Sequence, residues 1–325
     1  MGHEKFLITG SMGCIGAWVI RHLIDEGADF VATDLSTDPV RPRLLLSEDE
    51  VRGANWLALD VTDTAAVTDA VAANGITHII HLAGLQVPFC RDNPPLGAAV
   101  NVVGTVNILE AARHNGVQGL AYASSLAALG PPEFYTTRPV PDDALTRPST
   151  LYGVYKVANE DTARIYWQDW QVGSIGLRPY NVFGIARDQG ITADIAKSIL
   201  AAAAKRPFHI RYGGEIAVQH ASDVARIFIG CARVGYEGAT VCNLRNDVID
   251  VADFVAELKR MHPNAEITFD AGNPLPFPAD LDDSGLKSIL GDVPHTPLTQ
   301  AIEQDFEAYA KLIAEDRIDL TQLDR

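Results

Sequence analysis

The segment "TGSMGCIG", residues 9–16, constrains the fold more than any other part of this chain. It follows a short apolar run, Lys5–Thr9, and precedes the amphipathic stretch "AWVIRHLIDEG". This order predicts a strand, a tight turn and a helix. Glycines at positions 10, 13 and 16 let the turn form, and they let backbone N–H groups approach a pyrophosphate at the helix N-terminus. The pattern therefore predicts a dinucleotide-binding βαβ unit.

A carboxylate at the end of the next strand indicates which dinucleotide would bind. The second expected strand, Phe30–Asp34, ends eighteen residues after Gly16. A carboxylate there accepts hydrogen bonds from a ribose 2′-hydroxyl and repels a 2′-phosphate, so Asp34 favours NAD over NADP. The alternative is that Asp34 only caps the following loop, "LSTD".

Strand-like and helical runs alternate through the first half of the chain. This alternation predicts an α/β fold with a doubly wound parallel sheet, of the Rossmann-like kind. Gly27 and Gly116 are expected to end two of the helices. Further strands are expected at Trp56–Leu59, His78–Leu82, Leu120–Ser124 and Ser174–Arg178.

The second half of the chain is organised differently. Residues 1–180 are expected to form an NAD-binding domain, and residues 181–325 mainly a smaller substrate-binding region. A strand near 239–244 is expected to return to the sheet, so the boundary is discontinuous along the chain. Three helical runs and a Pro-rich connection at 271–280 supply the rest of the smaller region.

Composition excludes several classes of partner. The formal net charge is -16, with hydrophobic residues at 47% and charged residues at 21%. Such a charge repels a phosphate backbone, so no nucleic-acid partner is expected. We find neither a signal-peptide pattern at the start nor a long apolar run, and we expect a cytoplasmic protein without a membrane partner.

Metal binding is not expected either. The four cysteines show no metal-ligand spacing. His78 and His81 in "HIIH" are three apart, and side chains three apart on a strand point to opposite faces.

The segment "LYGVYKVANE", residues 151–160, contains two tyrosines and one lysine. On a helix, Tyr152 and Lys156 share a face because they are four residues apart, whereas Tyr155 points about 100° away from Lys156. A nearby cation would lower the pKa of Tyr152 from about 10 and would allow proton transfer with a carbinol near neutrality. The alternative is a packed helix with a surface lysine, and Tyr155 is expected to pack.

These motifs together carry a family resemblance. The ordered set "TGSMGCIG", "HLAG", "NVVGTVN", "YASS", Y-x-x-x-K and "LRPYNVFG" resembles the extended short-chain dehydrogenase/reductase family, in its NAD-dependent epimerase/dehydratase group. The resemblance implies that Ser125, with Ser124 as the adjacent alternative, binds the substrate oxygen. It implies that Tyr152 is the general acid or base, and that Lys156 binds the nicotinamide ribose while lowering the tyrosine pKa.

The same resemblance, with the motifs above, implies a set of cofactor contacts. Asp60 would accept from the adenine amino group, although "DVTD" is equally an ordinary helix start through Thr62 or Asp63. Asn101 matches a position that organises the site, although it could equally be a polar residue on a nearby helix. The expected cofactor-binding residues are Gly10, Met12, Gly13, Cys14, Ile15, Gly16, Asp34, Asp60, Val61, Leu82, Ala83, Gly84, Asn101, Tyr152, Lys156, Tyr180 and Val182.

Two departures from the family pattern bear on the substrate. Ile216 stands where nucleotide-sugar epimerases commonly place an arginine that holds the diphosphate, and Leu129 replaces a usual tyrosine. A nucleotide sugar therefore loses support, and a hydroxylated, acidic small molecule suits the polar residues that remain. The expected substrate-binding residues are Ser124, Ser125, Asn181, Arg187, Gln189, Thr192, Arg211 and Gln219.

The resulting functional hypothesis is hydride transfer between NAD and a secondary carbinol of a sugar, sugar acid or polyol. One alternative is a sugar or nucleotide-sugar epimerase/dehydratase that retains its NAD. Another is a non-catalytic NAD-binding sensor, which the complete Ser125, Tyr152 and Lys156 set disfavours. By analogy with the family, a homodimer is expected through the helices "AAVNVVGTVNILEAA" and "YKVANEDTARIYWQDW".

Overall fold

The architecture centres on one seven-stranded sheet in a computed structural model that describes residues 4–324. The strand order is β10-β6-β5-β4-β1-β2-β3, and every neighbouring pair is parallel. This confirms the predicted doubly wound, Rossmann-like α/β fold. The strands are β1 Lys5–Thr9, β2 Asp29–Asp34, β3 Trp56–Ala58, β4 His78–His81, β5 Gly119–Ala123, β6 Ser174–Arg178 and β10 Ala239–Asn243.

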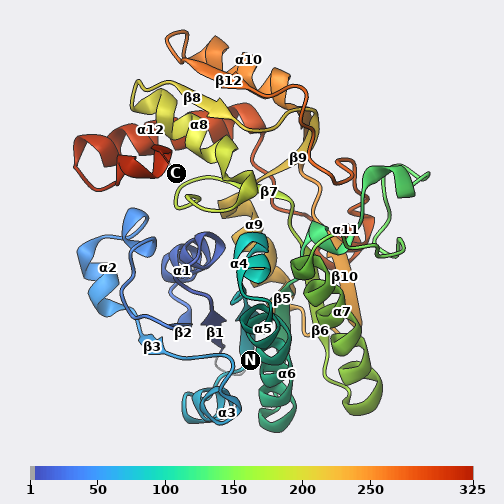
Figure 1. Ribbon diagram of the computed structural model, residues 1–325. Coiled ribbons are helices and arrows are strands. Elements are labelled where there is room, and N and C mark those ends of the chain that lie inside the picture. The colour runs from blue at the N-terminus through green and yellow to red at the C-terminus, as the bar shows by residue number, and fades with distance from the viewer. Residues whose placement is uncertain (1–3, 325) are drawn as a thin grey trace.

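Alternation along β1 gives the sheet two buried faces. Phe6 and Ile8 pack into one apolar cluster, whereas Leu7 packs into the other, because successive strand residues point to opposite faces. Helices α1 (Cys14–Glu26) and α9 (Ala221–Arg233) cover the first face, and the second is covered by α3 (Thr64–Ala73), α6 (Gly104–Asn115) and α7 (Leu151–Trp170). Figure 1 shows this layered arrangement.

Two helices of this layer end as expected. Gly27 and Gly116 follow α1 and α6 with φ angles of 66° and 62°. This left-handed conformation lets their N–H groups satisfy the last carbonyls of the helix. The "NVVGTVN" segment differs from the expectation of a regular helix, because residues Ala99–Val103 form a π-helical turn, η2, before α6.

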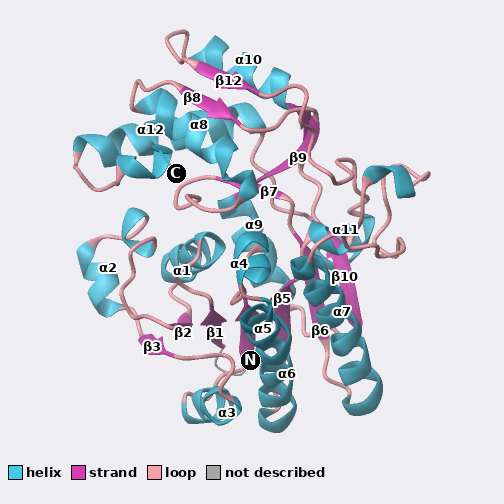
Figure 2. Cartoon of the chain, in the orientation of Figure 1, coloured by secondary structure: helices cyan, strands magenta, loops and turns pink. Residues whose placement is uncertain are grey.

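A smaller group of elements lies beyond the carboxyl ends of the sheet strands (Figures 1 and 2). It contains a three-stranded sheet, β11-β9-β7, and a two-stranded sheet, β12-β8. Its strands are β7 Asn181–Phe183, β8 Phe208–Ile210, β9 Glu215–His220, β11 Asp247–Asp250 and β12 Ile267–Phe269. Its helices are α8 Asp194–Ala203, α10 Val251–Met261 and α12 Leu298–Ala314. A third apolar core fills this group.

Short helices connect the larger elements. They are α2 Glu48–Gly53, α4 Val87–Asp92, α5 Pro94–Ala98, α11 Ser284–Leu290 and the short turns η1 Pro42–Leu44, η3 Leu126–Ala128, η4 Pro132–Phe134, η5 Ile191–Ala193 and η6 Leu320–Asp324.

The histidines of "HIIH" form hydrogen bonds with threonines. His81 Nδ1 lies 2.7 Å from Thr9 Oγ1, its Nε2 lies 3.2 Å from Thr105 Oγ1, and His78 Nδ1 lies 2.8 Å from Thr77 Oγ1. Within residues 4–324, no group of three or more His, Cys, Asp or Glu side chains is arranged to hold a metal ion. His81 therefore connects β4 to β1 and α6, whereas His78 is hydrogen-bonded to the residue before it.

The expectation that no segment could cross a membrane needs one correction. The helical stretch Pro94–Asn115 is 22 residues long, its most apolar window of 18 residues has a mean hydropathy of 1.2, and by length and composition alone it could span a bilayer. Half of its most apolar window is buried inside the protein. A core helix has the same composition, so this feature is weak evidence for a membrane segment.

Candidate active site

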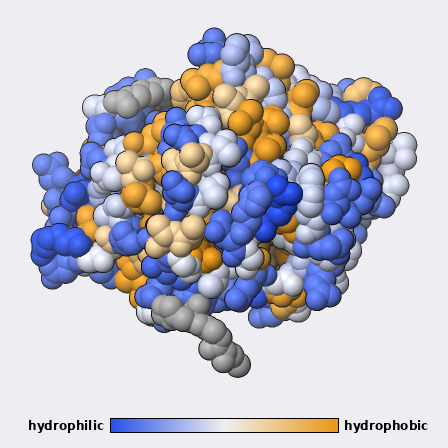
Figure 3. Space-filling view, turned by 90° about the horizontal axis from the view of Figure 1, so that it is seen from below, coloured by the Kyte–Doolittle hydropathy of each residue, from blue (hydrophilic) through white to orange (hydrophobic). Residues whose placement is uncertain are grey.

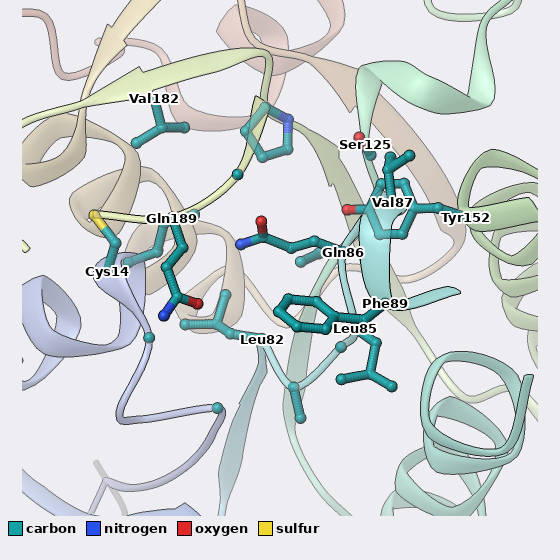
Figure 4. Close-up of a pocket in the computed structure, with 18 of the residues that line it drawn as sticks. Cys14, Leu82, Leu85, Gln86, Val87, Phe89, Ser125, Tyr152, Val182 and Gln189 are labelled. Atoms are coloured by element: carbon teal, nitrogen blue, oxygen red, sulfur yellow. The ribbon is translucent and has the colours of Figure 1, made fainter. Parts of the chain in front are cut away.

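A cavity of about 620 Å³ lies at the carboxyl edge of the large sheet. The ends of β1, β2, β4 and β5 line it together with residues 186–192 and 275–277. Figure 4 shows Ser125 and Tyr152 at one side, Cys14 and Gln189 at the other, and Gln86 and Phe89 between them. Ligands bind at this edge of open α/β sheets, and the volume suits a small molecule beside an extended cofactor.

The glycine loop forms one wall of the cavity. A Cβ on Gly10 would lie 2.6 Å from Ala83 N, and one on Gly16 would lie 2.5 Å from Gly10 O, so neither position accepts a side chain. Helix α1 begins directly after Gly13, which offers no side-chain cap. The N–H groups of its first turn have no partner within the helix and are open to an anion. This cradle fits a pyrophosphate.

Asp34 lies at the end of β2 beside this loop. Its Oδ2 accepts a hydrogen bond from Met12 N at 3.0 Å, and its Oδ1 accepts one from Leu35 N at 2.8 Å. The carboxylate lines the cavity while also capping the start of the following loop. The two interpretations of Asp34 in the sequence are therefore compatible, and a ribose hydroxyl would meet a fixed acceptor.

The "DVTD" segment divides its roles between two aspartates. Asp63 is the N-cap of α3 and accepts from Ala66 N at 3.0 Å. Asp60 lines the cavity, and its Oδ1 accepts from Thr62 N and Thr62 Oγ1 at 2.9 and 2.8 Å. Helix capping thus belongs to Asp63, which leaves Asp60 at the cavity.

Asn101 is the one expected cofactor residue that does not line the cavity. It is buried, and its Nδ2 donates to Gly97 O at 2.9 Å and to Leu85 O at 3.2 Å. Its Oδ1 has no partner, and a Cβ on Gly84 would lie 2.8 Å from that atom. Asn101 therefore supports the loop after β4 from behind.

The Y-x-x-x-K pair lies on the first turns of α7. Both Tyr152 and Lys156 line the cavity, and Lys156 Nζ lies 5.4 Å from the centroid of the Tyr152 ring. The same Nζ donates a hydrogen bond of 2.6 Å to Ala123 O. Tyr155 points elsewhere and donates to Pro94 O at 3.0 Å. Helical spacing therefore selected the tyrosine that faces the cavity.

The pKa of Tyr152 differs from the expectation. Burial raises it above its ordinary value, and a hydrogen-bonding interaction with Ser125 and the charge of Arg187 act in the opposite direction. Lys156 was expected to lower this pKa, but its ammonium group is bonded to Ala123 O. Burial also lowers the pKa of Lys156 to about 8. Electrostatic support for Tyr152 within the protein thus comes from Ser125 and Arg187.

Ser124 and Ser125 have different surroundings at the end of β5. Ser124 is buried, and its hydroxyl donates to Glu160 Oε1. Glu160 in turn binds Arg178 through two contacts, of 2.8 and 2.7 Å. Ser125 is partly exposed in the cavity wall, so the geometry favours it over Ser124 as the serine that meets substrate.

The six expected substrate residues other than the two serines divide into two groups of three. Arg187, Gln189 and Thr192 line the cavity, and Arg187 Nη2 donates to Thr192 Oγ1 at 3.1 Å. Arg187 Nε is buried without a partner, and no salt bridge to Arg187 occurs among the residues that the structure describes. Arg187 is thus a cation available to an anionic ligand.

The other three expected substrate residues lie outside the cavity lining. Asn181 is buried and donates to Tyr212 Oη at 2.9 Å. Gln219 is buried, accepts from Tyr180 N at 2.8 Å and donates to Leu244 O at 3.0 Å. Arg211 forms a two-contact ion pair with Asp194. Their polar groups are used in holding the protein together, which spacing along the sequence could not show.

Sequence reasoning missed several cavity residues. Gln86 and Phe89 follow β4, and their position after a parallel strand could have suggested them. Leu275 and Phe277 come from the Pro-rich connection, where no local pattern indicated a site. Arg41 also lines the cavity, from the loop after β2. Ile216, in contrast, is fully buried in the apolar core of the smaller group.

Comparison with known proteins agrees with this geometry. A family model described as "NAD dependent epimerase/dehydratase family" matches residues 6–240. A UDP-glucose 4-epimerase of Mycolicibacterium smegmatis is 32% identical over 204 residues, which are 61% of this chain and 63% of that protein. The first curated relatives are thus matched over only about half to three fifths of their length.

Solved structures extend the likeness over almost the whole chain. An L-threonine dehydrogenase of Clostridium difficile has a TM-score of 0.82 at 22% identity, covering 96% of this chain and 99% of that one. A Thermus thermophilus UDP-glucose 4-epimerase in complex with NAD has a TM-score of 0.77 at 20% identity, covering 94% and 98%. At such identities the likeness concerns the fold.

Proposed function

Because the chain belongs to the NAD-dependent epimerase/dehydratase family and is an NAD-dependent enzyme, we propose that it oxidises a secondary carbinol of a sugar, sugar acid or related polyol. The observation that carries this proposal is the meeting of Ser125, Tyr152 and Lys156 in the wall of the cavity that also contains the glycine loop. The proposed acid-base residue and the glycine loop that would bind the dinucleotide therefore line the same cavity.

Each of the three side chains has a distinct task in this proposal. NAD, when bound, supplies the acceptor for the hydride of the carbinol carbon. Ser125 orients the substrate hydroxyl by a hydrogen bond, and Tyr152 takes its proton. Lys156 fixes the end of β5 through Ala123 and lies 5.4 Å from the centroid of the tyrosine ring.

The remaining cavity residues favour an acidic substrate. Within residues 4–324, Arg187 forms no ion pair with a carboxylate, and a guanidinium group binds a carboxylate well through two parallel hydrogen bonds. Ile216 lies in the apolar core, so no cation at that position is available for a diphosphate. We therefore place a sugar acid ahead of a nucleotide sugar as substrate.

A cofactor and substrate assay tests the proposal. Purified protein is denatured, the supernatant is assayed for NAD, and native protein is then incubated with NAD and a panel of sugars, sugar acids and polyols while absorbance is read at 340 nm. Net NADH formation with a sugar acid, abolished by Tyr152→Phe, is the expected result. Absence of NADH with every member of a broad panel would contradict the dehydrogenase.

An epimerase that retains its NAD is the second candidate. It would use the same three side chains and return the hydride to the other face of the oxidised carbon. The relatives named UDP-glucose 4-epimerase favour it. Stoichiometric NAD in the purified protein, without net NADH, and interconversion of two epimers detected by NMR would select this candidate.

We also propose how the chain is organised and assembled. Residues 1–180 would form the NAD-binding domain and residues 181–325 mainly the substrate-binding region, with β10 returning to the large sheet. Two copies would pair through α6 and α7, which lie side by side in Figure 1. The exposed apolar side chains that support such a pairing are Val103, Val154 and Trp170.

On the face seen from below in Figure 3, hydrophobic and hydrophilic side chains are interspersed. Light scattering of the purified protein would measure its mass in solution and so test the dimer. We also propose a cytoplasmic location.

A further inference from the structure

Residues 184–192 lie between β7 and α8, and residues 186–192 of this loop line one side of the cavity. Its backbone is left-handed at Gly184 (φ 133°), Ala186 (φ 74°) and Gly190 (φ 101°). A residue with a Cβ rarely adopts this conformation unless its surroundings impose it, so the shape of the loop at Ala186 depends on contacts with other elements.

Two side chains hold the start of this loop. Trp18 Nε1, on α1, donates to Ile185 O at 3.0 Å, and Tyr309 Oη, on α12, donates to Gly184 O at 3.0 Å. Trp18 and Tyr309 therefore fix the loop to the helix that follows the glycine loop and to the C-terminal helix.

The middle of the loop is held by Arg41, and its end is held by Tyr212 Oη, which donates to Thr192 O at 3.3 Å. Arg41 Nε lies 2.8 Å from Asp188 Oδ1, and Arg41 Nη1 donates to Met12 O at 2.9 Å. Arg41, Asp188 and Met12 all line the cavity, and the two charged side chains are 23% and 30% exposed. The guanidinium group of Arg41 thus joins the 184–192 loop to the glycine loop, which would hold the cofactor pyrophosphate.

We propose that Arg41 and Asp188 form a latch that controls the release of NAD. The inference rests on the NAD-binding part of the proposed function and is independent of the substrate. With the ion pair formed, residues 186–190 stay against the glycine loop and the dinucleotide cannot leave. With the pair broken, Trp18 and Tyr309 still hold the start of the loop and Tyr212 still holds Thr192, so only residues 186–190 swing away.

A different role for Arg41 makes the opposite prediction for Asp188. If Arg41 bound the pyrophosphate directly, removing the Asp188 charge would free the guanidinium and would slow NAD release or leave it unchanged. A latch instead requires both partners, so removing either one speeds release. The two substitutions together should then act about as strongly as one alone, because they break the same contact.

Release of the reduced cofactor can be measured without any substrate. Protein loaded with NADH is mixed with excess NAD, and the loss of bound-nicotinamide fluorescence gives the dissociation rate. We expect Arg41→Gln and Asp188→Asn each to raise this rate about fivefold, the upper range for one partly exposed ion pair. The double variant should match the single variants.

Arg43→Gln is the matched control. Arg43 lies two residues away, pairs with Glu48 at 3.0 Å on the surface and does not line the cavity, so its loss should leave the rate unchanged. A rate for Asp188→Asn equal to or below that of the wild type would overturn the latch. The latch would also be overturned if the effects of Arg41→Gln and Asp188→Asn on the NADH dissociation rate multiplied in the double variant.

Salt gives a second readout. Because ions screen a partly exposed pair, raising the salt concentration should speed NADH release from the wild type. The same salt series should change the rate much less in Asp188→Asn. An absent salt effect in the wild type would count against the latch, whereas a failed substrate panel would bear only on the dehydrogenase proposal.

Discussion

Lys156 donates a 2.6 Å hydrogen bond from its ammonium group to the main-chain oxygen of Ala123. This bond ties α7, which carries Tyr152, to the end of β5, which carries Ser125. One turn further along α7, Glu160 accepts from Ser124 and binds Arg178 of β6. The relative positions of the proposed catalytic groups are therefore set by contacts on the side of α7 that faces the sheet.

Tyr152→Phe should lower kcat about 100- to 10,000-fold, the range that a positioned proton-transfer group contributes, while NAD still binds. Tyr155→Phe is the matched control, because it removes a hydroxyl from the same helix that is bonded to Pro94 O outside the cavity. Steady-state rates and NADH binding by fluorescence would measure both variants. Equal losses of activity in the two variants would remove the special role of Tyr152.

Asp34→Ala should shift cofactor preference toward NADP by about tenfold or more, because a charged hydrogen bond to the ribose and a repulsion of the 2′-phosphate are both lost. Affinity for NAD should also fall, since Asp34 no longer accepts from Met12 N. The KM values for the two cofactors measure the shift, with Asp38→Ala in the same exposed loop as control. No gain with NADP would separate Asp34 from the ribose.

Glu160→Gln should reduce the free energy of unfolding by about 3–5 kcal/mol, because it leaves the guanidinium group of Arg178 buried without its counter-ion. Asp161→Asn, next to it on α7, breaks only an exposed pair with Arg164 and should cost less than about 1 kcal/mol. Urea unfolding of both variants provides the comparison. If the two variants lost similar amounts of free energy of unfolding, the Glu160–Arg178 pair would not stabilise the protein more than the exposed Asp161–Arg164 pair.

His81 should make the protein less stable as the pH falls below about 6.5. Burial lowers the pKa of His81 to about 3, so between these values the unfolded chain binds a proton that the folded chain does not. The free energy of unfolding therefore decreases by up to about 1.4 kcal/mol per pH unit from this group. His81→Asn should show a shallower slope in urea unfolding between pH 6.5 and 4.5; an unchanged slope would exclude His81 as the cause.

The local parts of the site were accessible from the sequence because they depend on short-range geometry. A strand, three spaced glycines and a helix define the cofactor loop, and a spacing of four on a helix distinguishes Tyr152 from Tyr155. Gly27 and Gly116 ended their helices as predicted for the same reason. These relationships involve residues within about one or two turns of each other.

The substrate side of the site was decided by tertiary structure. Arg187 and Arg211 looked equivalent in the sequence, but Asp194 binds Arg211, whereas Arg187 faces the cavity. Phe277 reaches the cavity from a distant connection, and Arg41 meets Asp188 across 147 residues of chain. The sequence by itself determined the fold, the cofactor and which of the two tyrosines faces the cavity, because regular strand and helix geometry encodes them. Which polar side chains stay free for a ligand was settled only by tertiary packing, because a buried charge or amide takes its partner from whichever segment folds against it.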